Sequence, residues 1–286
     1  MRVLINREAI IKNIKRAKTL SRGVPVSLLF KDFYEDIYSE IPPMGCEIFS
    51  MNINLSNCYA IGQATKSHDG AVITSLSQIT PELSRSLYSV FIPINAFDNR
   101  EGLAVGDAWS LARDVKKEYP HLDVIGMITS GCLNERAPKV EDLERIWEEM
   151  RELKGCMSSI SLGGSYWLGR EEKLPPFVRD IRIGEYMLFG TIPYSDDKSK
   201  EGENAIHIEA EVIGVYPERN QILLDFGYAK AEPDKCQYPS GLFYVDSSSE
   251  YTILYTTEEY KVGDQILIKP NYKSLVKLRN AVREYL

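Results

Sequence analysis

Histidine is scarce in this chain of 286 residues, and cysteine does not occur in pairs. The three histidines are far apart in the sequence, at His68, His121 and His207. The five cysteines form no C-x-x-C motif and are Cys46, Cys58, Cys132, Cys156 and Cys236. Zinc sites and disulfide frameworks depend on clustered cysteines or histidines. The pattern therefore argues against a metal centre or a disulfide scaffold and indicates free thiols.

The chain also lacks a long apolar run and an excess of positive charge. No stretch of about 18 apolar residues occurs, and Met1–Asn6 lead directly into an amphipathic segment without the hydrophobic region of a signal peptide. The formal net charge is −7, whereas binding to nucleic-acid backbones depends on clustered Lys and Arg. We therefore expect a cytoplasmic protein that binds neither membranes nor nucleic acids.

Short apolar runs that alternate with helical or turn-rich segments are frequent instead. Eight such runs have the length of strands and fall at 26–30, 47–52, 59–63, 71–75, 90–95, 124–129, 159–162 and 181–189. Helices are expected at 6–21, 32–41, 81–88, 106–119 and 140–154. Because buried parallel strands have this near-continuous apolar character, the pattern favours an α/β fold with a (β/α)8 TIM-type barrel. A doubly wound sheet is the alternative, since the second to fourth runs leave little room for helices between them.

The pattern changes near residue 195. Residues 195–202 are polar and rich in turn-forming residues, which is typical of a linker. Beyond it, the expected strands belong to an antiparallel β domain and lie at 207–215, 221–224, 241–245, 251–255 and 265–268. We therefore expect a barrel domain at 1–195 and a smaller C-terminal β domain at 203–286.

Lys31 directly follows the first apolar run, Val26–Phe30. Catalytic groups of barrels lie at the C-terminal ends of the strands. A lysine that is partly desolvated there has a lowered pKa and can form an imine with a carbonyl cofactor. Position alone leaves an ordinary strand-end lysine open as the alternative.

Two small-residue turns come after the last two barrel runs. The first contains Gly163-Gly164-Ser165, and the second contains Gly184-Glu185. Glycine lets the backbone approach a ligand closely, so such turns can offer N–H groups and a hydroxyl to a phosphate. A simple glycine turn is the alternative for each one taken alone.

Taken in order, Lys31, Ser161-Leu-Gly-Gly-Ser165 and Arg182-Ile-Gly-Glu-Tyr186 resemble the alanine racemase-like group of fold-type III pyridoxal-phosphate (PLP) enzymes. The resemblance is closest to the ornithine racemase-like branch. Further similar segments are 99–102, 129–132, 248–254, 260–264 and 271–272, so the similarity extends over nearly the whole chain. Two positions depart from the family pattern: Gly164 replaces an asparagine, and Glu250-Tyr251 replace an Asp-His pair.

The resemblance implies a PLP-binding barrel with a C-terminal β domain, assembled as a homodimer with shared active sites. Lys31 would hold PLP as an imine. The phosphate would be bound by Ser165 and by the backbone of Gly184 and Glu185, together with Tyr272.

The resemblance also implies contacts to the cofactor ring. Arg182 would face the pyridine nitrogen and keep it unprotonated, which weakens the electron sink and suits racemisation. Arg100 would lie near the O3′ side of the ring, and Ser130 would lie near its face.

These implications favour an amino-acid racemase, with a basic amino acid such as ornithine as the expected substrate. Racemisation requires a base on each face of the substrate Cα. Lys31 is one candidate, and Tyr251 of a partner subunit is the other, although a packing role in the β domain is the alternative for Tyr251. Two other functions stay open: a fold-type III decarboxylase, whose Cys-x-x-x-Asp segment is not reproduced around Cys236, and a PLP carrier or regulatory protein without catalytic activity.

Overall fold

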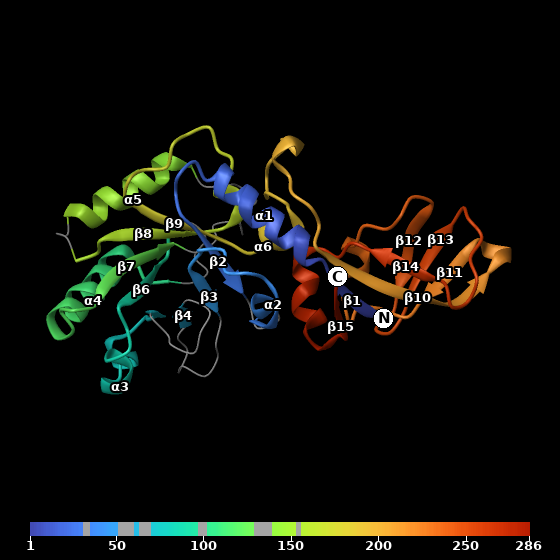
Figure 1. The fold of residues 1–286 in the computed structure, drawn as a ribbon, viewed down its shortest axis with the longest axis horizontal. Coiled ribbons are helices and arrows are strands. Elements are labelled where there is room, and N and C mark those ends of the chain that lie inside the picture. The colour runs from blue at the N-terminus through green and yellow to red at the C-terminus, as the bar shows by residue number, and fades with distance from the viewer. Residues whose placement is uncertain (31–34, 51–59, 63–69, 97–101, 129–138, 153–155) are drawn as a thin grey trace. The chain divides into compact units, whose positions relative to one another are not determined.

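A computed structural model describes residues 1–30, 35–50, 60–62, 70–96, 102–128, 139–152 and 156–286. The chain divides into two compact units. The barrel unit comprises residues 13–187 and 191–201, and the β unit comprises residues 1–12, 188–190 and 202–286. Figure 1 shows the elements of both units along the chain.

The barrel unit is built around eight strands. They are β2 Val26–Phe30, β3 Ile48–Ser50, β4 Ala60–Gly62, β5 Gly70–Val72, β6 Ser89–Ile94, β7 Asp123–Ile128, β8 Ser159–Gly163 and β9 Val178–Ile183. Each strand pairs with the next along the chain, and β9 pairs with β2, so the sheet closes on itself. These strands overlap the eight apolar runs of the sequence.

The strand directions depart from a regular (β/α)8 barrel. Six of the eight pairings are parallel, but β4 runs antiparallel to both β3 and β5. A parallel connection needs a crossover of a dozen or more residues, whereas an antiparallel one can be short. The connecting residues 51–59 and 63–69 are too few for helical crossovers. The prediction of a TIM-type barrel is therefore confirmed only in part. The fold is α/β with a mostly parallel sheet, but it does not consist of eight repeated βα units.

Six α-helices are described: α1 Arg7–Leu20, α2 Glu35–Glu40, α3 Pro81–Ser84, α4 Val105–Glu118, α5 Val140–Glu152 and α6 Glu185–Phe189. The side chain of Asn6 caps α1, because its Oδ1 accepts a bond from the N–H of Ala9 at 3.0 Å. Helix α4 packs against β6, β7 and α5. Short 3-10 turns are η1 Leu76–Gln78, η3 Ser165–Trp167, η4 Lys198–Lys200, η5 Pro217–Arg219, η6 Pro233–Lys235 and η7 Tyr272–Asn280.

One predicted strand was too long. The apolar run at 181–189 predicts a single strand, but β9 ends at Ile183 and α6 begins at Glu185. Tyr186, Met187 and Leu188 are all fully buried in the helix. A short run of buried residues has no period that separates strand from helix, which is why the sequence pattern missed the change.

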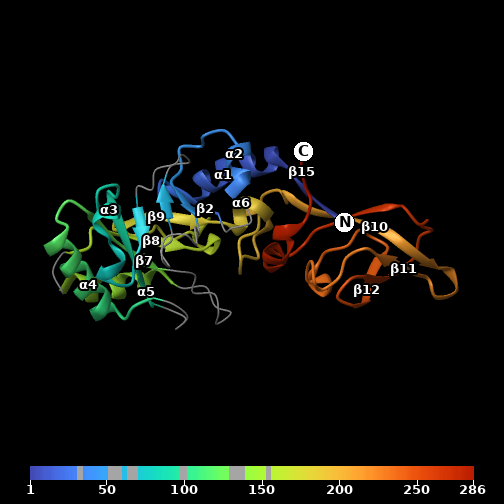
Figure 2. The ribbon, with the colours of Figure 1, turned by 90° about the horizontal axis from the view of Figure 1, so that it is seen from below.

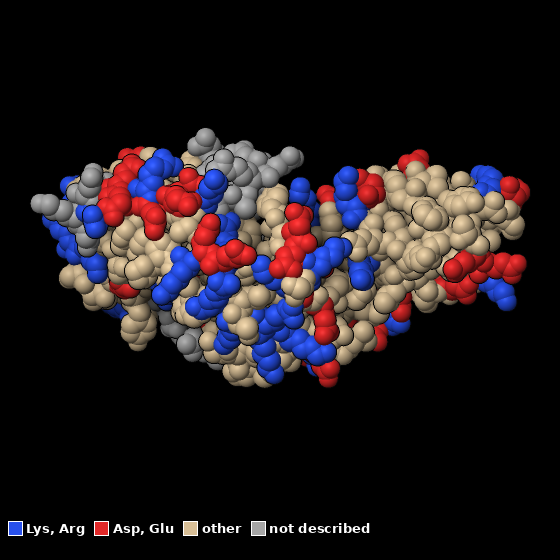
Figure 3. Space-filling view, turned by 90° about the horizontal axis from the view of Figure 1, so that it is seen from above, with Lys and Arg blue, Asp and Glu red and all other residues tan. Residues whose placement is uncertain are grey.

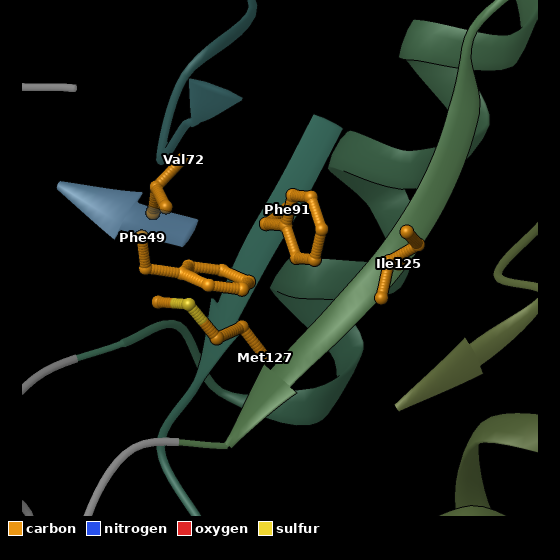
Figure 4. Packing of buried hydrophobic residues seen from close by; sticks show 5 residues of the cluster. All are labelled: Phe49, Val72, Phe91, Ile125 and Met127. Carbon is orange, nitrogen blue, oxygen red and sulfur yellow. The ribbon is translucent and has the colours of Figure 1, made fainter. Parts of the chain in front are cut away.

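An apolar cluster fills one side of the barrel interior (Figure 4). It consists of Phe49 on β3, Val72 on β5, Phe91 on β6, and Ile125 and Met127 on β7. The rings of Phe49 and Phe91 meet edge to face, with centroids 5.2 Å apart. Burial of each large apolar side chain contributes about 1.5–3 kcal/mol. These five side chains therefore form a packed apolar part of the barrel core.

The β unit contains one sheet of seven strands. They are β1 Arg2–Ile5, β10 Ile206–Tyr216, β11 Gln221–Leu224, β12 Leu242–Ser247, β13 Thr252–Thr256, β14 Gln265–Ile268 and β15 Arg283–Tyr285. The five strands predicted after residue 203 are all present, and β10 and β11 are labelled again in Figure 2.

The first and last strands of the chain were not predicted. β1 lies between β10, to which it is antiparallel, and β15, to which it is parallel. Residues 1–12 therefore group with the β unit, and this division differs from the expected barrel boundaries of 1–195. These strands were missed because their pairing is long-range. Val3 lies opposite Ile208, and local sequence patterns do not reveal so distant a partner.

Acidic and basic side chains are interspersed on the face shown in Figure 3, over the described part of the chain. This distribution agrees with the modest negative net charge. None of the helices formed by the described residues is both long and apolar enough to cross a membrane.

Candidate functional site

The turns that follow β8 and β9 lie next to each other. These strands are parallel neighbours, and Gly163 pairs with Arg182 across them. Ser165 is 3% exposed and opens the first turn. Its Oγ accepts a bond from the N–H of Tyr186 at 3.0 Å, which joins the first turn to the second. A hydroxyl that accepts one bond can still donate its own proton, and this suits an anion such as phosphate.

Gly184 forms the second turn, between β9 and α6, and Glu185 is the first residue of α6. The carboxylate of Glu185 accepts a bond from Thr191 Oγ1 at 3.1 Å. Because Tyr186 is the next residue, the bond to Ser165 brings this backbone to the Ser165 turn. The structure thus brings together Ser165, Gly184 and Glu185, three of the four residues predicted to bind a phosphate, while their binding role stays a prediction.

The structure explains why a glycine stands at position 164 in this chain. Its φ is +114° and its ψ is 132°, a conformation that is essentially restricted to glycine. A Cβ built on Gly164 would lie 2.3 Å from Cε1 of Tyr166, whose side chain is buried. The ring of Tyr166 therefore fills the space that a side chain at position 164 would need, including the asparagine of the family pattern.

Gly164→Ala is expected to lower the free energy of unfolding by about 3 kcal/mol or more, because strain in the backbone adds to the clash with Tyr166. Gly23→Ala is the matched control. Gly23 also has a positive φ, +94°, but its Cβ would meet nothing within 4 Å, so the cost should stay near the roughly 1–3 kcal/mol of backbone strain. Chemical denaturation of both variants measures the difference, and equal costs would refute the packing explanation.

Arg182 is held inside the barrel near the end of β9. Its side chain is only 4% exposed. Nη1 donates to Ser161 Oγ at 2.5 Å, and Nη2 donates to the backbone oxygen of Ile128 at 2.7 Å. The guanidinium carbon also lies 5.3 Å from the ring centroid of Phe49. These contacts come from β8, β7 and β3, so three other strands fix the position of this cation.

Asp180 is the buried acceptor at the centre of this polar side of the barrel. Its Oδ1 accepts from the hydroxyl of Ser161, and its Oδ2 accepts from Ser27 Oγ at 3.0 Å and from Arg179 Nη1 at 2.7 Å. Asp180, Ser161 and Ser27 are each at most 2% exposed. A buried carboxylate is stable only when donors surround it, and Asp180 has three.

The charges of this region balance. Arg179 also binds Glu47, with Nη2 donating to Oε1 at 2.9 Å. Arg179 and Arg182 thus supply two positive charges, and Asp180 and Glu47 supply two negative charges. Burial alone would lower the pKa of Arg179, but its bonds to Glu47 and Asp180 outweigh that effect and raise it. The region is therefore a hydrogen-bonded network without net charge. Asp180 and Arg182 are buried, whereas Arg179 and Glu47 are partly exposed.

Arg182 was predicted from the sequence, but Asp180 and Ser27 were not. The bond from Ser161 to Asp180 was not predicted either. A signal was available in the alternation of β9, because Asp180 and Arg182 are two residues apart and so share one face of a strand. A charged pair on the inner face of a predicted barrel strand requires buried partners. Polar residues on the neighbouring strands β2 and β8 were the places to search.

Lys31, Arg100 and Ser130 lie outside the described residues. The strand that leads to Lys31 is in place: Phe30 ends β2 and is 1% exposed. β2 lies between β9 and β3 in the sheet, and Ser27 pairs with Arg182. The predicted roles of the three residues therefore stay predictions.

Tyr251 belongs to the turn between β12 and β13 and is 41% exposed. Its N–H donates to Ser248 Oγ at 3.2 Å. The N–H of Tyr228 donates to the backbone oxygen of Ser248 at 2.9 Å, so this second exposed tyrosine lies at the same turn. A hydrogen bond with Tyr244 raises the pKa of Tyr228 to about 12. The β unit thus presents two exposed tyrosines at one place, and sequence reasoning had considered only Tyr251.

Tyr272 and Cys236 also belong to the β unit. The ring of Tyr272 packs edge to face against Phe189, with centroids 6.0 Å apart. Cys236 is a free thiol whose Sγ donates to the backbone oxygen of Glu232, and burial raises its pKa to about 12. Cys236 is therefore protonated and unreactive near neutral pH, and the phosphate-binding role of Tyr272 stays a prediction.

Comparison with curated proteins gives one partial match. D-serine dehydratase from Dictyostelium discoideum is 26% identical over 121 residues, which is 34% of this chain and 31% of that protein. The match thus spans less than a third of the relative's length. No family model matches the chain.

Comparison with solved structures covers the whole chain. D-threonine aldolase from Filomicrobium marinum superposes with a TM-score of 0.72 at 14% identity, over 99% of this chain and 91% of that one. D-threo-3-hydroxyaspartate dehydratase from Delftia sp. HT23 superposes with a TM-score of 0.67 at 13% identity, over 100% of this chain and 93% of that one. Alanine racemase from Acinetobacter baumannii superposes with a TM-score of 0.65 at 16% identity, over 99% of this chain and 100% of that one. The chain therefore has the fold that these three enzymes share.

Proposed function

We propose that this protein binds PLP at the ends of β2, β8 and β9 and acts on an amino acid. The observation that supports this most directly is the buried Arg182 one strand away from the Ser165 turn, in a fold shared with alanine racemase. Arg182 and the hydroxyl of Ser165 form a donor set that fits a ring nitrogen and a phosphate. Lys31, at the end of β2, supplies the amine that a carbonyl cofactor requires.

The binding residues have distinct tasks in this proposal. Ser165 and the backbone N–H groups of Gly184 and Glu185 bind the phosphate, and Tyr272 assists them. Lys31 forms the covalent link to the cofactor.

The remaining residues act at the ring. Arg182 would donate to the pyridine nitrogen; because a guanidinium stays protonated and cannot accept, that nitrogen would keep its lone pair and no proton. By the resemblance, Arg100 would contact the O3′ side, and Ser130 would contact the ring face. When bound, PLP withdraws the electrons left at the substrate Cα after its proton is removed.

Racemisation is the reaction that we propose for this site. Lys31 removes or returns the Cα proton on one face, and Tyr251 of a partner subunit acts on the other. Tyr228 is less suited as a base, because its bond to Tyr244 raises its pKa to about 12. The proposal requires a homodimer with shared sites, and a basic amino acid such as ornithine is the proposed substrate.

A dehydratase is a second candidate, supported by the partial similarity to D-serine dehydratase. A variant of the hydroxyaspartate dehydratase is described in a metal-free form, so that enzyme has a metal site. In this chain, the described residues include no group of three or more His, Cys, Asp and Glu placed to hold a metal ion. Sensitivity to a chelator therefore helps to separate the two candidates.

The decisive experiment is exchange of the α-proton in D₂O, tested with both enantiomers of each amino acid and of ornithine. Exchange with inversion of configuration supports the racemase, and we expect it to persist in EDTA. Release of ammonia and a keto acid, lost in EDTA, would instead identify a dehydratase. Release of CO₂ would identify a decarboxylase, and bound PLP without any exchange would identify a carrier.

A further inference from the structure

We propose that Asp180 is a positioning residue that acts through Ser161 to hold the guanidinium of Arg182 in one orientation. The three side chains form a chain of hydrogen bonds from Arg182 Nη1 to Ser161 Oγ, and from the Ser161 hydroxyl to Asp180 Oδ1. The part of this inference that concerns the cofactor rests on the proposed function, whereas the positioning itself does not.

The chemistry of the three groups fixes the direction of the chain. A guanidinium can only donate hydrogen bonds, and a carboxylate can only accept them. The Ser161 hydroxyl therefore gives its proton to Asp180 and turns its lone pairs toward Arg182. Without Asp180 this hydroxyl could rotate, and its proton could then face the cation.

Burial gives this arrangement its strength. Ser161 is 0% exposed, Asp180 is 1% exposed and Arg182 is 4% exposed. Hydrogen bonds to charged groups are stronger in such surroundings, and neighbouring bonds polarise each other. The backbone oxygen of Ile128 and the ring of Phe49 then limit the remaining motion of the guanidinium.

Ser27 provides a matched control. Its Oγ donates to Asp180 Oδ2 at 3.0 Å, and it is 2% exposed, so it resembles Ser161 in residue type, burial and partner. Among the contacts of the described residues, Ser161 is the serine that bonds both Asp180 and Arg182. Loss of the Ser27 hydroxyl removes a bond to the same carboxylate but keeps the connection to Arg182.

The first test uses the protein without added PLP. NMR of ¹⁵N-arginine-labelled protein follows hydrogen exchange of the Arg182 guanidinium, assigned by its disappearance in Arg182→Lys. We expect Ser161→Ala and Asp180→Ala to speed this exchange about tenfold, as loss of a bond to a charged group implies. Ser27→Ala should leave it within about twofold of the wild type. Equal exchange in the two serine variants would overturn the proposal.

The second test asks whether this positioning serves the cofactor. We expect Ser161→Ala to raise the dissociation constant for PLP about tenfold and to shift the pH dependence of the bound cofactor's absorption, while Ser27→Ala does neither. If both serine variants bind PLP like the wild type, Asp180 does not act on the cofactor site. If the wild type binds no PLP, the proposed function fails, but the exchange measurement still decides the positioning.

Discussion

Lys31→Ala is expected to abolish the visible absorption of bound PLP and to lower turnover by at least roughly 10²–10⁴-fold, the contribution of one positioned base. The loss should exceed that of a base alone, because the variant also lacks the amine that links the cofactor to the protein. Absorption spectra and steady-state α-proton exchange measure the two effects. In the wild type, borohydride reduction followed by peptide mapping should place the cofactor on the peptide that contains Lys31.

Lys139→Ala is the control for this experiment. Lys139 is an exposed residue just before α5, so its replacement should change neither the spectrum nor the activity. If Lys31→Ala kept the absorption band, with the reduced cofactor mapped to another lysine, the cofactor link proposed for Lys31 would be wrong.

Asp180→Ala is expected to lower the free energy of unfolding by about 3–5 kcal/mol, the cost of breaking a buried charge pair by removing one partner. The variant leaves Ser27, Ser161 and Arg179 without their common acceptor inside the barrel. Denaturant titration of the protein without added PLP measures the effect independently of function.

Asp180→Asn refines this test. Its amide oxygen can still accept from Ser161, but its NH₂ group faces Arg179 and cannot accept from it. We therefore expect an intermediate loss of stability. If Asp180→Ala unfolded at the same denaturant concentration as the wild type, the network would contribute nothing to the stability of the barrel.

The strands of the barrel were predictable from the sequence because each is a short apolar run between turn-forming residues. The strand directions were not fully predictable. The closeness of the second to fourth runs indicated missing helices, but it did not reveal that β4 is reversed. Direction depends on which neighbours a strand pairs with, and local composition does not encode that.

The site was predictable where a residue type is rare or a turn is distinctive. Arg182 and Ser165 were identified in this way, and the structure joins their turns through Tyr186. Asp180 was missed because it belongs to no motif and lies just before the predicted run at 181–189. Its partner Ser27 is more than 150 residues away. The alternation along β9 placed Asp180 and Arg182 on the same face. Their partners could be identified only with the register of β2, β8 and β9, which the structure provides.

The position of β1 has a consequence for how the chain acquires its structure. β1 precedes both of its partners, β10 and β15, by more than 200 residues. The β sheet can therefore be completed only after β15 has left the ribosome, and closing such a long loop is entropically costly. A fragment of residues 203–286 would lack this inner strand. β15 would lose its pairing with β1, and β10 would keep β11 and β14 but expose the edge that β1 covers, which favours aggregation. A circular permutant in which β1 follows β15 would place all seven strands of the β sheet in one continuous stretch of chain.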